Sequence, residues 1–218
     1  MHPIEHHTTR ERLLEAAGEI FAEHGFRNTT VRDICSAARA NVAAVNYHFG
    51  DKMGLYEAVV MYANDWALKK YPLLLEGEDF AGKTPQDRLS HFIYVFMMRF
   101  LDPGRPSWHG QLMSREMADP TEVLDRLVIS MVRPTLEVVM TILRELMGAE
   151  VDETSVRMCA FSVIGQCIFY HHGKPMHCRM NFFDYTDPET PKRIAAHITL
   201  FTLGAVEHIR QETRKANA

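Results

Sequence analysis

The chain has 218 residues, of which 46% are hydrophobic and 24% are charged, and its net charge is −4. This composition excludes a disordered or fibrous protein and supplies enough apolar side chains for one or two packed domains. The acidic balance also excludes a protein that coats nucleic acid without specificity, because neutralising phosphates requires an excess of Lys and Arg.

Neither a membrane span nor an export sequence is expected. The longest unbroken apolar run, Phe92–Met98, has seven residues, whereas a membrane-spanning helix needs about 20. Residues 1–7 are polar and lack the apolar centre of a signal peptide. We therefore expect a cytoplasmic protein that does not bind a membrane. Its four cysteines should stay reduced there, and no two of them have the spacing of a zinc ribbon or a redox pair.

Helix-type patterns dominate the sequence and alternating strand patterns are not found, so we predict an all-α fold. Thr8 and Glu11 have the spacing of a capping box, and Gly25 is a typical stop for the helix that follows. Thr30 and Asp33 repeat the capping-box spacing at the start of a second helix. Four helices are predicted in this part of the chain, at residues 9–24, 30–38, 41–49 and 51–70.

Beyond residue 70, clusters of Gly, Pro and Asp separate the apolar segments. Pro134 lies inside one long helical segment and should kink it, because Pro removes a backbone donor and clashes with the preceding turn. The candidate helices in this part are at residues 85–100, 107–118, 121–147, 152–171 and 190–213.

The second and third predicted helices are separated by only a few residues. A gap that short forces a sharp crossing, which is the geometry of a helix-turn-helix. Val31 and Ile34 of the second helix should pack against Val45 and Phe49 of the third and fix the crossing angle.

The outer face of the third helix consists of small residues, namely Ala43, Ala44 and Asn46. Small side chains let a helix lie deep in the major groove of DNA. Tyr47 and His48, at its far end, can donate hydrogen bonds to phosphates. Lys52 can attract phosphates by its charge. The spacing and composition together predict a DNA-binding motif.

The first sixty residues resemble the N-terminal domain of TetR/AcrR-type transcriptional regulators. The segments AAGEIFAEHGF, TTVRDI, YHFGDK and LYEAV stand at the spacing of that family. The segment NVAAVNYHFGDK is most similar to the CecR-like branch. The chain length and the segment GQCIFYHHGKP are similar to the C-terminal domain of the same branch, but they are less specific.

This resemblance implies a homodimeric regulator, which binds a palindromic operator and is released by a small ligand. We expect no cofactor. The resemblance also implies a helix-turn-helix DNA-binding domain over residues 1–53 and a helical ligand-binding and dimerisation domain over residues 54–218. The residues that it places on DNA are Thr30, Arg32, Asn41, Val42, Ala43, Ala44, Asn46, Tyr47, His48 and Lys52.

The sequence departs from the family at two positions. Arg39 stands in the helix-turn-helix turn where the family usually has Gly. If that position needs a positive φ, Arg39 is strained there; alternatively, its side chain reaches a phosphate. Gly54 stands where the family often has Glu, so the fourth helix should begin less firmly. Residues 1–52 hold six Lys and Arg against seven Asp and Glu, so charge does not decide for or against DNA.

An apolar ligand pocket is predicted around the segment that precedes and includes the 107–118 helix. Met and aromatic side chains recur there at helical spacing and suit an adaptable cavity for a hydrophobic or aromatic effector. The alternative is a plain hydrophobic core. The candidate pocket residues are Phe92, Phe96, Phe100, Trp108, Met113 and Met117.

Two broad apolar stripes lie on the last two predicted helices. Two such helices from each of two subunits can pack as a four-helix bundle, which would also set the distance between the recognition helices. The alternative is a core within one chain. The candidate dimer residues are Val156, Cys159, Ala160, Val163, Cys167, Ile198, Phe201, Ala205 and Ile209.

A cluster of His171, His172, His177 and Cys178 has side chains that bind soft metals, but no acidic or Cys pair supports such a site. We expect polar groups at a helix end instead and predict no metal site. Whether the cluster binds a metal stays open.

We therefore expect a ligand-responsive DNA-binding transcriptional regulator. It should be a repressor that binds double-stranded operator DNA as a homodimer and responds to a small apolar or aromatic effector. From the residues alone, the alternatives are a helical small-molecule-binding module without DNA binding and an all-α enzyme. We expect no enzyme, because the sequence has no Gly-rich phosphate loop, G-x-S-x-G or H-E-x-x-H motif.

Overall fold

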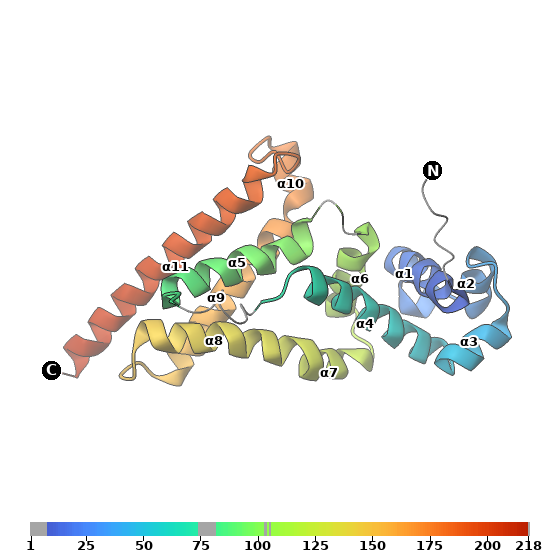
Figure 1. The fold of residues 1–218 in the computed structure, drawn as a ribbon, viewed down its shortest axis with the longest axis horizontal. Helices are drawn as coiled ribbons and strands as arrows, with labels where there is room; N and C mark the ends of the chain where they lie inside the picture. Colours follow the sequence, from blue (N-terminus) through green and yellow to red (C-terminus); the bar gives the residue numbers. More distant parts are fainter. Residues whose placement is uncertain (1–7, 74–81, 103, 105, 218) are drawn as a thin grey trace. The chain divides into compact units, whose positions relative to one another are not determined.

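The structure, a computed structural model, describes residues 8–73, 82–102, 104 and 106–217. Within these ranges the regular elements are helices and no strand occurs, which confirms the all-α prediction (Figure 1). Across the same ranges, no helix combines the length and the apolar character that crossing a membrane requires.

By its contacts the chain divides into two compact units. Unit 1 comprises Met1–Ala67 and Gly104–Val128, and unit 2 comprises Leu68–Pro103 and Ile129–Ala218. These units do not follow the predicted boundary between residues 53 and 54, which was drawn by function, and that boundary stays a prediction.

Unit 1 begins with four helices at or near the predicted positions: α1 (Thr9–Asn28), α2 (Val31–Ala37), α3 (Val42–Phe49) and α4 (Lys52–Lys70). Both predicted capping boxes form. The Thr8 hydroxyl accepts from the Glu11 amide at 3.2 Å, and the Glu11 carboxylate accepts from the Thr8 amide at 2.8 Å. At Gly25 the backbone leaves helical geometry with φ 79°, and one further turn follows it instead of the predicted stop.

The core of unit 1 joins the first three helices. The side chains of Leu13, Ala17 and Phe21 on α1 are fully buried, as are Ile34 on α2 and Val45 on α3. Val31 and Phe49, also predicted for this small core, are half-buried. The crossing of α2 and α3 is therefore fixed by apolar packing, as a helix-turn-helix requires.

Helix α6 (Ser107–Ala118) packs on α1 inside unit 1. A Cβ added at Gly18 would lie 2.6 Å from the Trp108 ring, so Gly18 permits this close approach. Glu15, on the same helix as Gly18, accepts hydrogen bonds from the Trp108 indole at 3.3 Å and from the Tyr62 hydroxyl at 2.9 Å.

Unit 2 is a helical bundle in which α5 (Pro85–Leu101), α8 (Arg133–Met147), α9 (Glu153–His172) and α11 (Glu189–Ala216) share one apolar core. Around Pro134, where a kink was predicted, the segment is not one continuous α-helix, and Pro134 lies in the first turn of α8. Helix α7 (Val123–Leu127) passes through the π-helical turn η2 (Val128–Val132) before α8 begins.

The short helix α10 (Lys174–Arg179) lies where the sequence indicated only a Gly-Lys-Pro turn. Pro175 is compatible with a helix here because it occupies the first turn, where its missing N–H is not needed.

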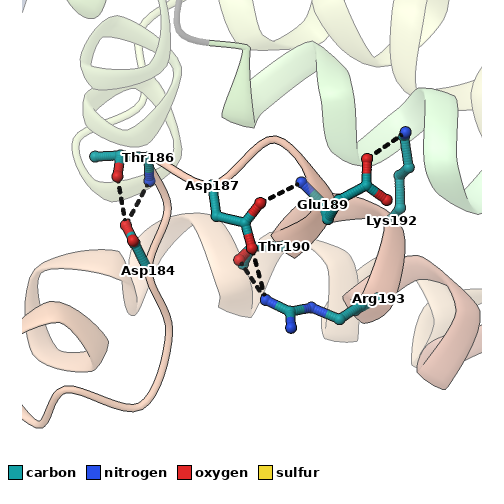
Figure 2. Close-up of polar contacts among 7 residues, drawn as sticks. All are labelled: Asp184, Thr186, Asp187, Glu189, Thr190, Lys192 and Arg193. Atoms are coloured by element: carbon teal, nitrogen blue, oxygen red, sulfur yellow. Dashed lines mark hydrogen bonds and ion pairs between the residues drawn. The ribbon is translucent and has the colours of Figure 1, made fainter.

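The start of α11 is organised by two aspartates (Figure 2). Asp187 accepts from the Glu189 amide and from the Arg193 guanidinium, each at 2.9 Å. Asp184 accepts from both the amide and the hydroxyl of Thr186. These contacts fix the loop that leads into the last helix.

Candidate nucleic-acid interface

Helix α3 presents most of its surface to solvent. Val45 is its only fully buried side chain, and Tyr47 is 85% exposed. The Asn41 side chain caps the helix by accepting from the Ala44 amide at 2.9 Å. Gly50, with φ 82°, ends it after eight residues. A short, capped and projecting helix is the shape that enters a major groove.

The structure places the predicted DNA-facing residues on the surface of one motif. Those on α2 and α3 that are exposed are Thr30, Arg32, Asn41, Val42, Ala43, Asn46, Tyr47 and His48, while Ala44 and Lys52 are half-buried. Their contact with DNA stays a prediction.

The Thr30 hydroxyl already has a partner, since it donates to the Asp33 carboxylate at 2.6 Å. Hydrogen bonds from Thr30 hold the pKa of Asp33 below its usual value. Thr30 therefore shapes the start of α2, and its hydroxyl must be shared if it also binds a phosphate.

The cations of residues 8–67 differ in what they contact. The Lys52 ammonium lies 4.4 Å from the centre of the Phe26 ring, and burial lowers its pKa. Arg10 lies over the Phe49 ring at 5.5 Å, and Arg27 pairs with Asp119 at 3.3 Å. Each of these cations is thus held by a ring or a carboxylate.

The N–H of Gly54 donates to the Asp51 side chain at 2.8 Å. This contact caps α4, so the helix has a defined start even without the Glu that the family often has at position 54.

Helix α6 makes further contacts within unit 1, which the sequence patterns did not indicate. The Arg115 guanidinium donates to the backbone carbonyls of Ala22 and Glu23, near the end of α1. The buried Glu116 carboxylate accepts from the Tyr56 hydroxyl of α4 at 2.6 Å. Burial and this bond raise the pKa of Tyr56 far above its usual value. The partners are 60 or more residues apart, so no local pattern could reveal them.

The six predicted ligand-pocket residues belong to two units. On α5, the rings of Phe92 and Phe96 stack at 5.8 Å, and Phe96 meets Phe100 edge-on at 5.2 Å. These three lie in or against the core of unit 2. On α6, in unit 1, Trp108 is buried, Met113 is half-buried and Met117 is exposed. The pocket itself stays a prediction.

The residues predicted for a dimer interface fall into two groups. The core of unit 2 already buries Val156, Ala160, Val163, Cys167 and Ile198. The others keep accessible surface: Cys159 and Ile209 are half-buried, and Phe201 and Ala205 are exposed. Large apolar side chains that the prediction missed are also exposed on the same two helices: Met158, Phe161, Phe169 and Leu200. Because the five buried residues already lie in the core of unit 2, a second copy of the chain could contact only the outer side of α9 and α11.

Two residues of the His cluster differ in burial. His177 is buried, with its Nδ1 2.9 Å from the Tyr185 hydroxyl, whereas Cys178 is exposed. The described residues contain no group of three or more His, Cys, Asp or Glu that could hold a metal ion. Near His177, a depression of about 520 Å³ is lined by apolar side chains that include Phe169, Met176 and Phe182.

A helix-turn-helix with a projecting second helix, followed by a helical bundle, defines a DNA-binding regulator. Comparison with known families agrees that the protein is a DNA-binding regulator and identifies its family. The chain belongs to the TetR family: residues 13–59 match "Bacterial regulatory proteins, tetR family" and residues 85–206 match "HTH-type transcriptional dual regulator CecR, C-terminal domain". The resemblance that the sequence motifs indicated is thereby confirmed. Membership of this family places the chain among regulators rather than enzymes.

Individual relatives are similar over most of the chain. The HTH-type transcriptional dual regulator CecR of Shigella flexneri is 24% identical over 171 residues, which is 76% of each protein. A crystal structure of a tetR-family regulatory protein from Rhodococcus RHA1 has a TM-score of 0.67 at 19% identity, with 92% of this chain and 97% of that chain covered. A structure of AibR in complex with isovaleryl coenzyme A and operator DNA has a TM-score of 0.64 at 15% identity and covers 88% and 96% of the two chains.

Proposed function

We propose that this DNA-binding regulator is a repressor that binds a palindromic operator as a homodimer and is released by a small apolar or aromatic ligand. The observation that carries the DNA-binding mode is helix α3, which buries Val45 and turns its small and polar side chains to solvent. The proposed place of action is the cytoplasm, where an operator is accessible.

In the proposed complex, α3 lies in the major groove. Ala44 and Asn46 meet base edges, where an amide can pair with adenine and a small side chain permits close approach. Tyr47 and His48 donate to phosphates. Lys52 adds a charge near the backbone, and its contact with Phe26 restricts where the ammonium can reach. Phosphate contacts of this kind position the helix without reading sequence.

The proposed homodimer uses the outer side of α9 and α11. Leu200 is 72% exposed and Phe201 is 61% exposed on α11, and Met158, Phe161 and Phe169 are exposed on α9. Exposed apolar side chains gathered on two neighbouring helices are typical of a protein interface. Two such helices from each subunit make a four-helix bundle with two-fold symmetry, which matches the symmetry of a palindrome.

The proposed effector acts through α4. This helix belongs to unit 1 up to Ala67 and to unit 2 from Leu68 onward, so it links the two units covalently. A ligand that binds one arrangement of unit 2 better than another shifts the population toward it. Through α4 the shift would change the spacing of the recognition helices. The solved AibR complex with an acyl coenzyme A and operator DNA supports a small-molecule effector for this fold.

The test begins with DNA fragments that the protein selects from a genomic pool and from the region beside its own gene. We expect a mobility shift that saturates as one dimer per palindrome. Asn46→Ala should change which base pairs are preferred. Tyr47→Phe should weaken binding about tenfold to thirtyfold per dimer and keep the preference, because it removes one hydrogen bond of roughly 1 kcal/mol from each subunit.

Two results would overturn the proposal. One is the absence of any shift with micromolar protein at low salt. The other is a sedimentation measurement in which wild-type protein and Phe201→Glu are both monomers at micromolar concentration, since the charge should break only an existing dimer. An effector is sought by adding apolar and aromatic compounds to the DNA complex and recording release.

A further inference from the structure

Arg39 has a backbone conformation that is unfavourable for any residue with a side chain. It lies in the turn between α2 and α3 with φ 49°, in the left-handed region. The turn is closed by the Arg39 amide, which donates to the Ser36 carbonyl at 3.3 Å, and by the Ala40 amide, which donates to the Cys35 carbonyl at 2.9 Å. A residue with a Cβ is strained in this region, whereas Gly is not. The backbone strain expected at position 39 is therefore present.

The Arg39 side chain does not offset this strain by contacts within the protein. It is exposed, and it makes no hydrogen bond, ion pair or ring contact with the described part of the chain. Other cations of unit 1 differ, since Arg10 and Lys52 lie over aromatic rings and Arg27 pairs with Asp119. Among the Lys and Arg side chains of residues 8–67, only Arg32 likewise has no described partner.

The position of Arg39 is close to the proposed recognition element. It lies two residues before Asn41, which caps the start of α3. Arg32, the other cation without a described partner, lies on the exposed side of α2 in the same motif. A planar guanidinium is suited to bidentate contact with a phosphate. The local excess of acidic residues makes each available cation more important for binding DNA.

We propose that Arg39 is a phosphate-binding residue of the DNA interface, and that the strained turn is retained because it carries this charge. The inference rests on the proposed operator binding and adds a contact from the turn itself. An anionic DNA backbone beside α3 is the partner that the exposed guanidinium fits.

The experiment measures the salt dependence of operator affinity for wild-type protein, Arg39→Gly, Arg39→Gln and Arg39→Lys. The probe is the duplex that wild-type protein selects from the genomic pool. Each lost phosphate contact should reduce the slope of log K against log salt by about 0.9, hence about 1.8 per dimer. A slope change of that size corresponds to operator affinity that is roughly sixtyfold lower than that of wild-type protein at 0.1 M salt, with no difference near 1 M salt. Arg39→Gly and Arg39→Gln should show this loss, and Arg39→Lys should retain most of the slope.

The stability of the same variants separates a role in binding from a role in folding. Arg39→Gly removes the backbone strain, so its Tm should equal or exceed that of wild-type protein while its affinity falls. Arg27→Gln is the matched control, because it removes the same charge from the same unit at a residue paired with Asp119. It should leave the slope unchanged.

Three outcomes would overturn the inference. An unchanged slope and affinity in Arg39→Gly would refute the Arg39 contact alone and leave operator binding intact. An equal slope change in Arg27→Gln would show that net charge, and not position, is responsible. A wild-type protein that binds no selected duplex would refute both this inference and the proposed function.

Discussion

The hydrogen bond between Tyr56 and Glu116 should be among the strongest side-chain contacts of unit 1. Tyr56 is 2% exposed and Glu116 is fully buried, and their oxygens are 2.6 Å apart. The Glu116 carboxylate also accepts from the amide of Thr121 at 2.8 Å and from its hydroxyl at 3.0 Å. Tyr56→Phe removes one donor and leaves the carboxylate buried with Thr121 alone.

The expected cost follows from the burial of both groups. Removing a hydrogen bond to a charged group costs about 1.5–3 kcal/mol, because a buried acceptor loses its partner without gaining water. For a chain of this size the corresponding fall in Tm is about 3–12 °C. Urea and thermal unfolding of Tyr56→Phe measure this loss directly. Tyr47→Phe is the matched control: Tyr47 is 85% exposed, and its loss of the same hydroxyl should change stability by less than about 0.5 kcal/mol.

A double-mutant cycle tests whether the effect belongs to this pair. Tyr56→Phe, Glu116→Gln and the double variant should show a coupling energy above about 0.5 kcal/mol, as residues in one hydrogen-bond network do. If Tyr56→Phe unfolds like Tyr47→Phe, or if the two changes are additive, the contact does not stabilise unit 1 and the reasoning is wrong.

The other predictions concern packing and ionisation in the same unit. Gly18→Ala should lower stability by about 1–3 kcal/mol despite the higher helix propensity of Ala, because the added methyl meets the Trp108 ring at 2.6 Å; stability equal to that of wild-type protein in urea unfolding would contradict this packing. Burial and a hydrogen bond to Glu15 raise the pKa of Tyr62 to about 12. Its contribution to stability is therefore complete below the unfolded-state pKa of about 10 and is lost as the pH rises toward 12. Unfolding between pH 9 and 12 should depend less on pH in Tyr62→Phe, and identical pH dependence in the two proteins would count against the shift.

The features that the sequence predicted well are those set by neighbours along the chain. The boxes of Thr8 with Glu11 and Thr30 with Asp33 depend on a three-residue spacing. Each box forms within one helical turn, so a local pattern is sufficient to reveal it.

The features that the sequence missed depend on partners far along the chain. In the sequence, the carboxylate of Glu116 and the guanidinium of Arg115 resemble ordinary surface charges, and only the packing of α6 on α1 within unit 1 gives them their partners. The apolar stripe of α9 presented a different difficulty. Periodicity places Val163 and Cys167 on one face, but it cannot distinguish a core within one chain from an interface between two. The structure buries both residues within the chain and leaves Phe161 and Phe169 exposed.

The hydrogen bonds from Arg115 to α1, just before the Gly25 kink, have a consequence for how this protein can be divided into fragments. The carbonyls of Ala22 and Glu23 face a guanidinium from a residue more than ninety positions later in the chain. A fragment that stops at residue 67 would leave these carbonyls to water and the Gly25 kink without its support. We therefore expect that α1 to α3, which contain the helix-turn-helix, do not fold stably without α6. A transfer of this DNA-binding segment to another protein would have to include α6.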